Sequence, residues 1–230
     1  MASPALANLR SSRIPELRAL LALRPRRDRL DPASVTTADA VNRACVVVLS
    51  AHLEGFVEDL IDDIIDALNS NGPATRDIPT ILLGTHVSDE LSTIASMTDP
   101  YRQADRICAM FVTYSPLWLS ENLSPGNLRS EAVTATLGNP GAKEIARALG
   151  LVGMSAVFVS IQMPRGADPE KRLNELVGIR NAIAHGGWPS LTDAQVDSYV
   201  SSVEAICEGL HGAAAIHVQQ VCQLPTLPWP

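Results

Sequence analysis

A long helical segment over residues 36–69 constrains the fold more than any other feature of the sequence. A capping-box-like pattern at Thr36 favours a helix start. The Asn-Gly-Pro run at residues 71–73 ends the segment. Within its first half, residues 45–49 are apolar on every side of a helix. We therefore expect this helix to lie buried at the centre of the fold.

The second half of this segment is acidic in a regular pattern. Glu58, Asp62 and Asp66 form one column at four-residue spacing, and Asp59 and Asp63 form another. Like charges at this spacing repel one another, so solvent, a divalent metal or a basic segment must offset them. A metal is the least favoured of the three, because exposed carboxylates in rows do not form a closed cage of oxygen ligands.

The N-terminal segment is the basic counterpart of this acidic helix. Residues 1–29 contain seven arginines against Glu16 and Asp28, a net charge of +5 in a chain whose formal net charge is −7, so the remainder carries −12. A short helix around residues 14–23 is expected there, with Asp-Pro at 31–32 ending the segment. The segment either grips RNA or docks on the acidic helix that follows. We favour docking because the acidic columns come next in the chain.

The rest of the chain is predicted to form further helices joined by loops, with one ambiguous stretch. Residues 152–163 are apolar and contain a glycine, and their pattern fits a buried helix or a short strand equally well. The expected elements are helices at 78–97 and 100–112, an irregular stretch at 115–127, a helix that starts at Asn139-Pro140 and ends at Gly150, a helix launched by Asp168-Pro169, and a last helix from a capping box at Thr192 and Gln195 to about His211.

Composition excludes several classes of protein. No apolar run reaches the roughly 18 residues that span a membrane, and the N-terminus is a poor signal peptide. The four cysteines lie far apart without a C-x-x-C pair or a Cys/His cluster, so neither a structural zinc site nor a disulfide framework is indicated. We interpret them as reduced, buried residues of a cytoplasmic protein. The acidic net charge argues against broad, non-specific binding of nucleic acid.

The stretch with chemically useful polar groups is residues 173–187, LNELVGIRNAIAHGG. Its apolar residues recur at helical spacing, which predicts an amphipathic helix. Arg180 falls on the apolar stripe, where a guanidinium is costly unless it is paired. Asn181 and His185 lie four positions apart and share a neighbouring face. The two glycines that follow end the helix and place His185 in its last turn.

Two interpretations of these polar residues are open from spacing alone. In the structural one, His185 complements the helix dipole and Arg180 closes a buried ion pair. In the catalytic one, the two residues perform acid–base chemistry, since the sequence contains no phosphate-binding loop, dinucleotide fingerprint, zinc-protease motif or nucleophile elbow. Histidine suits proton transfer from a ribose 2′-hydroxyl, and arginine suits the charge that builds on the attacked phosphate.

The segment from Arg180 to His185, RNAIAH, resembles the R-x4-H motif of the HEPN superfamily. Two other stretches, ACVVVLSAHLEGFVEDL at 44–60 and NPGAKEIARALGL at 139–151, resemble the RiboL-PSP branch of that superfamily. The three stretches occur in the family's order. The N-terminal arm and the C-terminal tail lie outside this resemblance.

The resemblance implies an all-α fold, a HEPN-like helical bundle with extra helices over residues 36–212. A basic arm at 1–35 and an extended or disordered Pro-rich tail at 213–230 would flank it. HEPN relatives are dimers whose motifs face each other across a groove, so Arg180 is expected to be buried at such an interface. Glu54 stands where related sequences tend to carry an acidic residue. It either pairs with the motif or is simply a polar residue on an exposed strip.

The function implied is a metal-independent RNA endonuclease that leaves a 2′,3′-cyclic phosphate and uses no cofactor. Its catalytic residues would be Arg180, His185, Asn181 and Glu54. The partners implied are RNA, a second copy of the chain and an antitoxin or neighbour-encoded protein, in a toxin or phage-defence system. The alternative is a non-catalytic HEPN-like helical interaction module that regulates a partner protein. In either case the acidic composition requires any RNA contact to use a local basic groove.

Overall fold

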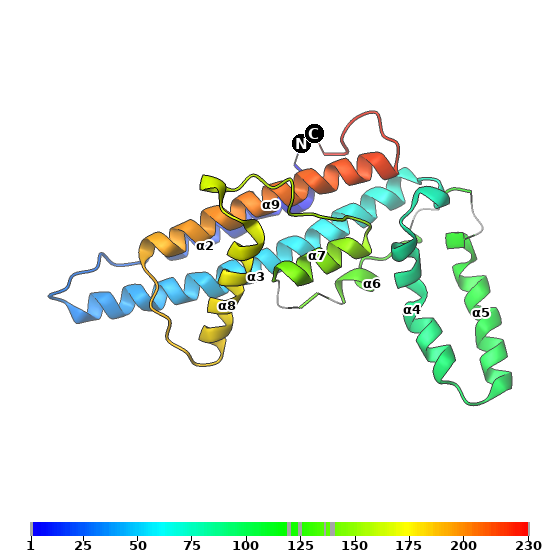
Figure 1. Ribbon diagram of the computed structural model, residues 1–230, viewed down its shortest axis with the longest axis horizontal. Helices are drawn as coiled ribbons and strands as arrows, with labels where there is room; N and C mark the ends of the chain where they lie inside the picture. The colour runs from blue at the N-terminus through cyan, green and yellow to red at the C-terminus, as the bar shows by residue number, and fades with distance from the viewer. Residues whose placement is uncertain (1, 119–120, 124–125, 136, 139–140, 230) are drawn as a thin grey trace. The chain divides into compact units, whose positions relative to one another are not determined.

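The computed structural model describes residues 2–118, 121–123, 126–135, 137–138 and 141–229 (Figure 1). Every regular element in these ranges is a helix, and the β contacts among them are two isolated bridges. The all-α expectation is therefore confirmed. No helix in the described part of the chain is both long enough and apolar enough to cross a membrane.

The chain divides into two compact units, and the long helices α3 and α9 contribute residues to both. The first unit comprises Met1–Leu60, Leu137–Ala146 and Ala156–Ala213, and the second comprises Ile61–Thr136, Arg147–Ser155 and Ala214–Pro230. The helices in chain order are α1 Pro4–Asn8, the π-helix η1 Leu9–Arg13, α2 Ile14–Ala22, α3 Pro32–Asn71, α4 Thr80–Ser96, α5 Pro100–Trp118, α6 Glu131–Thr134, α7 Ala142–Leu151, α8 Pro169–Ala184 and α9 Asp193–Val221, with short 3₁₀ turns at Thr75–Asp77 and Pro164–Gly166.

Helix α3 is the central helix of the first unit, as predicted, but it begins earlier than residue 36. Asp31 caps it by accepting a hydrogen bond from the backbone N–H of Ala33 at 3.0 Å, and Pro32 occupies the first turn. The hydroxyl of Thr36 donates to the carbonyl of Pro32 inside the helix instead of capping it. The apolar stretch at 45–49 is largely buried, although Val47 is 38 % exposed.

The N-terminal segment is a packed part of the first unit. Leu6, Leu9, Ile14 and Leu17 are buried, and α2, α3 and α9 run side by side (Figure 1). Five of the seven arginines in residues 1–29 form ion pairs across these helices. They are Arg10 with Glu208 at 2.7 Å, Arg13 with Asp59 at 2.9 Å, Arg18 with Glu204 at 2.8 Å, Arg24 with Asp197 at 3.3 Å and Arg27 with Asp39 at 2.7 Å.

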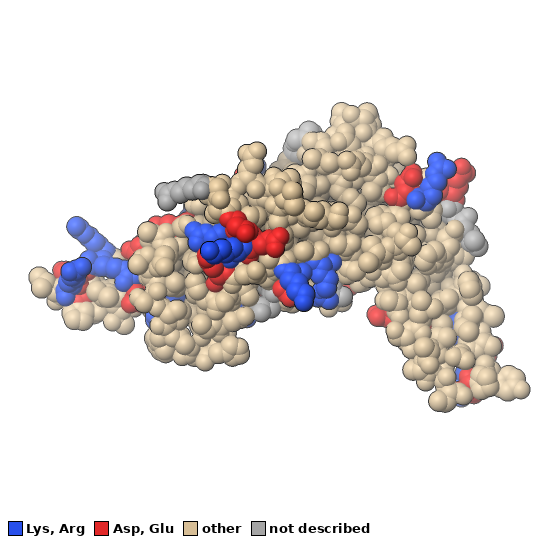
Figure 2. All heavy atoms as spheres, viewed as in Figure 1, with Lys and Arg blue, Asp and Glu red and all other residues tan. Residues whose placement is uncertain are grey.

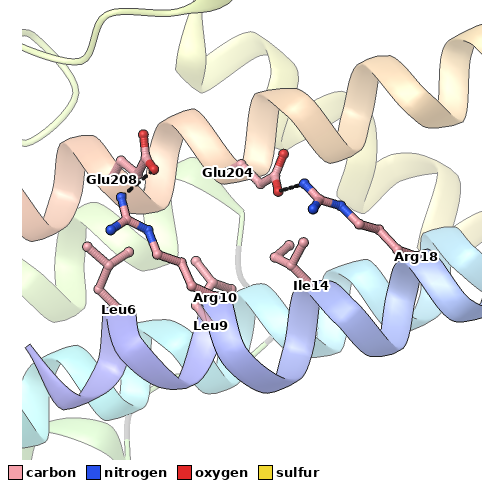
Figure 3. A pocket seen from close by; sticks show the side chains of 7 residues that line it. All are labelled: Leu6, Leu9, Arg10, Ile14, Arg18, Glu204 and Glu208. Carbon is pink, nitrogen blue, oxygen red and sulfur yellow. Dashed lines mark hydrogen bonds and ion pairs between the residues drawn. The ribbon is translucent and has the colours of Figure 1, made fainter. Parts of the chain in front are cut away.

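Docking of the arginine segment is therefore confirmed, but on two helices instead of one. Asp39 and Asp59 belong to α3, whereas the other three partners belong to α9. Figure 3 shows two of these pairs on either side of a hollow of about 280 Å³ with an apolar floor. In the acidic columns Asp59 is neutralised in this way, while Asp62 and Asp66 are exposed to solvent.

The second unit contains an antiparallel hairpin of α4 and α5 (Figure 1). Asp99 caps α5 by accepting from the backbone N–H of Tyr101 at 2.9 Å, and Arg106 and Glu90 form an ion pair across the hairpin. Helix α5 continues to Trp118 through Pro116, where an irregular stretch was expected. Proline cannot donate to the carbonyl of Val112, and the hydroxyl of Ser115 donates to that carbonyl at 3.0 Å in its place.

Three further expectations are corrected by the structure. The stretch at 152–163 is neither a helix nor a strand, because it forms turns in which most apolar side chains are buried, although Val159 is 85 % exposed. Helix α9 extends to Val221 instead of ending near His211, since the Ala-rich run at 213–215 favours helix and is largely buried. Cys108 is exposed, whereas burial of all four cysteines was predicted. The predicted helix start at Asn139-Pro140 lies outside the described residues.

Candidate functional site

Helix α8 carries the motif and begins as its sequence predicts. Asp168 caps it by accepting hydrogen bonds from the backbone N–H groups of Glu170 at 2.9 Å and Lys171 at 3.2 Å. Pro169 occupies its first turn. Arg172 fixes this end to α9 by donating to the hydroxyl of Ser198 and by lying 5.1 Å from the ring centroid of Tyr199. The first half of α8 is thus anchored in the first unit.

Burial decreases along α8 toward the motif. Leu173, Leu176 and Val177 are buried, Arg180 is half-buried and His185 is exposed. The apolar stripe that predicted burial of Arg180 therefore opens to solvent within the single chain. This leaves the motif accessible at the C-terminal end of an otherwise packed helix.

Arg180 is held by its sequence neighbour and not by an acidic group. Its Nη1 donates to Oδ1 of Asn181 at 3.1 Å. Among the described residues no carboxylate forms an ion pair with it. The buried ion pair that the structural interpretation requires is absent from this part of the chain. Arg180 therefore keeps a charge that an external anion can neutralise.

His185 is the C-terminal cap of α8. Its backbone N–H donates to the carbonyl of Asn181 at 3.0 Å, and the N–H of Gly187 returns to the carbonyl of Ala182 at 2.8 Å. Gly186 has a φ of +80°, in the left-handed region that favours glycine. A Cβ at Gly187 would lie 2.7 Å from the oxygen of Ala182, so this turn requires both glycines. The turn fixes the backbone of His185 while its side chain stays in solvent.

Glu54 lies half-buried on α3. In the described ranges it forms no hydrogen bond or ion pair with Arg180 or His185, so the structure does not join it to the motif. Its catalytic role stays a prediction. The nearby His52 faces a different carboxylate, with its Nε2 3.4 Å from Glu16.

Sequence reasoning missed a cation–aromatic pair beside the motif. The guanidinium carbon of Arg43, on α3, lies 4.6 Å from the centroid of the Trp188 ring. Trp188 is 79 % exposed, and it is followed by Pro189. The Gly-Gly-Trp-Pro run directly after His185 was the local signal that pointed to this residue, but its partner lies 145 positions earlier in the chain.

Charged side chains of both signs share the visible surface. On the face shown in Figure 2, most Lys and Arg atoms lie beside Asp and Glu atoms.

Within the described ranges, no group of three or more His, Cys, Asp or Glu side chains is arranged to hold a metal ion. A mainly apolar hollow of about 320 Å³ lies in the α4–α5 hairpin, lined by side chains that include Val87, Phe111 and Trp118.

The family model of the RiboL-PSP-HEPN family matches residues 9–215. The chain belongs to this family. The match spans α8 and its R-x4-H motif, and it also includes most of the N-terminal segment, which the three resembling stretches had left outside. Neither a curated protein nor a solved structure matches the chain. The family assignment therefore depends on the family model and agrees with the helical fold.

Proposed function

We propose that this RiboL-PSP-HEPN protein is a metal-independent RNA endonuclease in which Arg180 and His185 act at a groove between two copies of the chain. HEPN domains are typically ribonuclease-like, bind RNA and dimerise. One observation carries the proposal: a guanidinium without a carboxylate partner among the described residues, and an exposed imidazole, share the open end of α8.

The proposed reaction is an internal transfer of the phosphodiester. His185 takes the proton from the ribose 2′-hydroxyl, and the freed O2′ attacks the adjacent phosphorus. The O2′–P bond forms as the P–O5′ bond breaks, which leaves a 2′,3′-cyclic phosphate and a 5′-hydroxyl. The departing O5′ receives its proton from His185 of the partner subunit. Arg180, oriented by Asn181, donates to the phosphate oxygens as negative charge builds on them.

The test is cleavage of single-stranded RNA in EDTA by the wild type and by His185→Ala. We expect the wild type to release a 2′,3′-cyclic phosphate product, and the variant to cleave on the order of 10² to 10⁴ times more slowly. RNA with a 2′-deoxyribose at the scissile position should resist both proteins. Equal, inert behaviour of both proteins toward RNA would favour the non-catalytic interaction module instead.

The dimer is testable separately by sedimentation. A dimer at micromolar concentration is expected because one His and one Arg per chain leave the leaving-group proton unsupplied. A pure monomer at that concentration contradicts the shared groove, whatever the cleavage result.

A role in a toxin or phage-defence system is proposed on the same basis. Induced expression of the wild type should arrest bacterial growth, while His185→Ala should not. Growth that is rescued by a neighbour-encoded protein would identify that protein as an antitoxin. Equal growth with both proteins would contradict a toxin role.

A further inference from the structure

The pair of Arg43 and Trp188 has the form of a binding site and not of a core contact. A tryptophan ring in a protein core is mostly hidden from water, but Trp188 is 79 % exposed. A guanidinium within 6 Å of a ring centroid is attracted to the ring face, and the observed distance is 4.6 Å. Stacking by Arg43 therefore orients an indole that remains open to solvent.

The charge of Arg43 has no neutralising partner in the part of the chain that the structure describes. No carboxylate among the described residues forms an ion pair with it, in contrast to Arg10, Arg13 and Arg27. Arg43 is half-buried on helix α3, so its backbone position is set by that helix. An aromatic ring beside an available guanidinium binds a flat ring and an adjacent anion together.

Chain connectivity places this pair next to the motif. Trp188 is three residues after His185, so their Cα atoms lie at most about 11 Å apart. The glycine turn between them is fixed by the hydrogen bond from Gly187 to Ala182. Pro189 restricts the backbone of Trp188 to extended conformations. The ring is therefore presented from a constrained turn whose backbone directly follows that of His185.

We propose that Trp188 and Arg43 form a subsite that stacks an unpaired nucleobase of single-stranded RNA, with the guanidinium of Arg43 on an adjacent phosphate. The inference extends the proposed function by naming the substrate class. Base–aromatic stacking tolerates any base, and it requires a base that is not already stacked in a duplex. The subsite thus selects single-stranded over double-stranded RNA and places the neighbouring phosphate at the motif.

The experiment measures RNA binding in a His185→Ala background, where cleavage does not interfere. Trp118→Phe and Trp229→Phe are added so that Trp188 is the remaining tryptophan of the three. We expect short single-stranded RNA to quench the fluorescence of Trp188, while an abasic oligomer of equal charge does not. Trp188→Ala leaves no tryptophan in this background, so its binding is followed by the fluorescence anisotropy of end-labelled RNA, and its dissociation constant should rise about 5- to 150-fold. Trp188→Phe should restore most of the affinity, and Arg43→Ala should weaken binding of normal and abasic RNA alike.

The outcomes separate this inference from the nuclease proposal. Trp188-dependent binding without cleavage by the native protein supports the subsite and overturns the nuclease. If cleavage is lost in His185→Ala but binding is unchanged in Trp188→Ala, the nuclease is supported and the subsite is overturned. Equal affinity for normal and abasic RNA, or no binding of single-stranded RNA at all, overturns the subsite. Thermal unfolding of each variant verifies that the exposed substitution leaves the fold intact.

Discussion

The arginines of the N-terminal segment and those near the end of α8 differ in what balances their charge. In the N-terminal segment five of seven are paired with carboxylates of α3 or α9. Beside the motif, Arg180 donates to an amide oxygen and Arg43 stacks on an indole. The densest run of basic residues, the N-terminal segment, is therefore not the part of the molecule best suited to bind an external anion. Its charge is used internally, by a chain whose remainder is acidic.

The histidines divide in the same way. Burial lowers the pKa of His52, His86, His211 and His217 below the ordinary value of 6.5. His185 is the histidine whose side chain is exposed. The packed parts of the fold therefore contain imidazoles with lowered pKa and arginines that are paired with carboxylates. Groups able to meet a substrate lie at the open end of α8.

The largest effect that tests this comparison is on catalysis. Arg180→Ala should slow RNA cleavage on the order of 10²-fold or more, because a donor aimed at the transition-state charge is lost. The free energy of unfolding should change by less than about 0.5 kcal/mol, since no described carboxylate is left unpaired. The matched control replaces Arg18, a more exposed arginine. The Arg18→Ala protein should cleave RNA as fast as the wild type. Similar losses in both variants would erase the distinction between the two sets.

The second effect is on stability and concerns an arginine of the N-terminal segment. Its substitution should destabilise the fold without slowing RNA cleavage. Arg27 donates to Asp39 at 2.7 Å, to Asp193 at 3.1 Å and to the carbonyl of Leu191 at 3.0 Å. Burial opposes ionisation of Asp193, but hydrogen bonds from Asn42 and Arg27 outweigh it and lower its pKa. Arg27→Ala removes the donor to Asp39, leaves Asn42 as the donor to Asp193 and to the carbonyl of Leu191, and should lower the free energy of unfolding by about 2 kcal/mol.

Urea denaturation measures this loss, with Arg29→Ala as the matched control. Arg29 is exposed two residues away and forms no ion pair among the described residues. Its substitution should leave the midpoint of the transition in place. RNA cleavage below the midpoint should be unchanged in both variants. A loss of cleavage in folded Arg27→Ala would mean that the N-terminal segment contacts the substrate after all.

A third effect is a pH dependence that comes from a packed histidine. Nε2 of His86 accepts from the backbone N–H of Arg129 at 2.7 Å, so Nδ1 carries the proton that is donated to the carbonyl of Leu82 at 2.8 Å. Burial lowers its pKa, and the charge of Arg129 lowers it further. The unfolded chain therefore binds a proton more readily than the folded one, and stability falls as pH drops below about 6.5.

The measurement compares the wild type with His86→Gln in urea at pH 7.5 and at pH 5.5. The wild type should lose on the order of 1 kcal/mol more than the variant over this interval. The other buried histidines titrate in both proteins, so the difference isolates His86. Equal losses would show that protonation of His86 does not oppose folding.

Local signals explain why α8 was predicted well. Its cap at Asp168 and the glycine turn after His185 are both contained within a few residues, and the structure has them where the sequence placed them. The expected end of α9 near His211 is too early, because the prolines of the tail oppose a helix while the alanines at 213–215 extend it to Val221. Pro116 favours the irregular stretch expected at 115–127, but the hydroxyl of Ser115 supplies the missing donor and the helix continues.

Contacts between distant positions were beyond local reasoning. The pairing of Arg43 with Trp188 joins α3 to a turn 145 residues later, and neither residue has a periodic signature. Docking of the arginine segment was expected from charge alone, but charge did not distinguish α3 from α9 as the acceptor. That choice depends on which carboxylates the packed helices bring near, which is a property of tertiary structure.

The smallest effect concerns the two ion pairs of Figure 3, Arg10 with Glu208 and Arg18 with Glu204. Both arginines are more than half exposed, at 56 % and 66 % of the side chain. Solvent screens such pairs, so Arg10→Ala and Arg18→Ala should each lower the free energy of unfolding by less than about 1 kcal/mol. Raising the salt concentration should shrink this difference further, since it weakens the pair in the wild type. If either substitution instead weakened RNA binding as much as Arg43→Ala does, the charge of the N-terminal segment would be shared with the substrate, and the contrast between the two sets of arginines would fail.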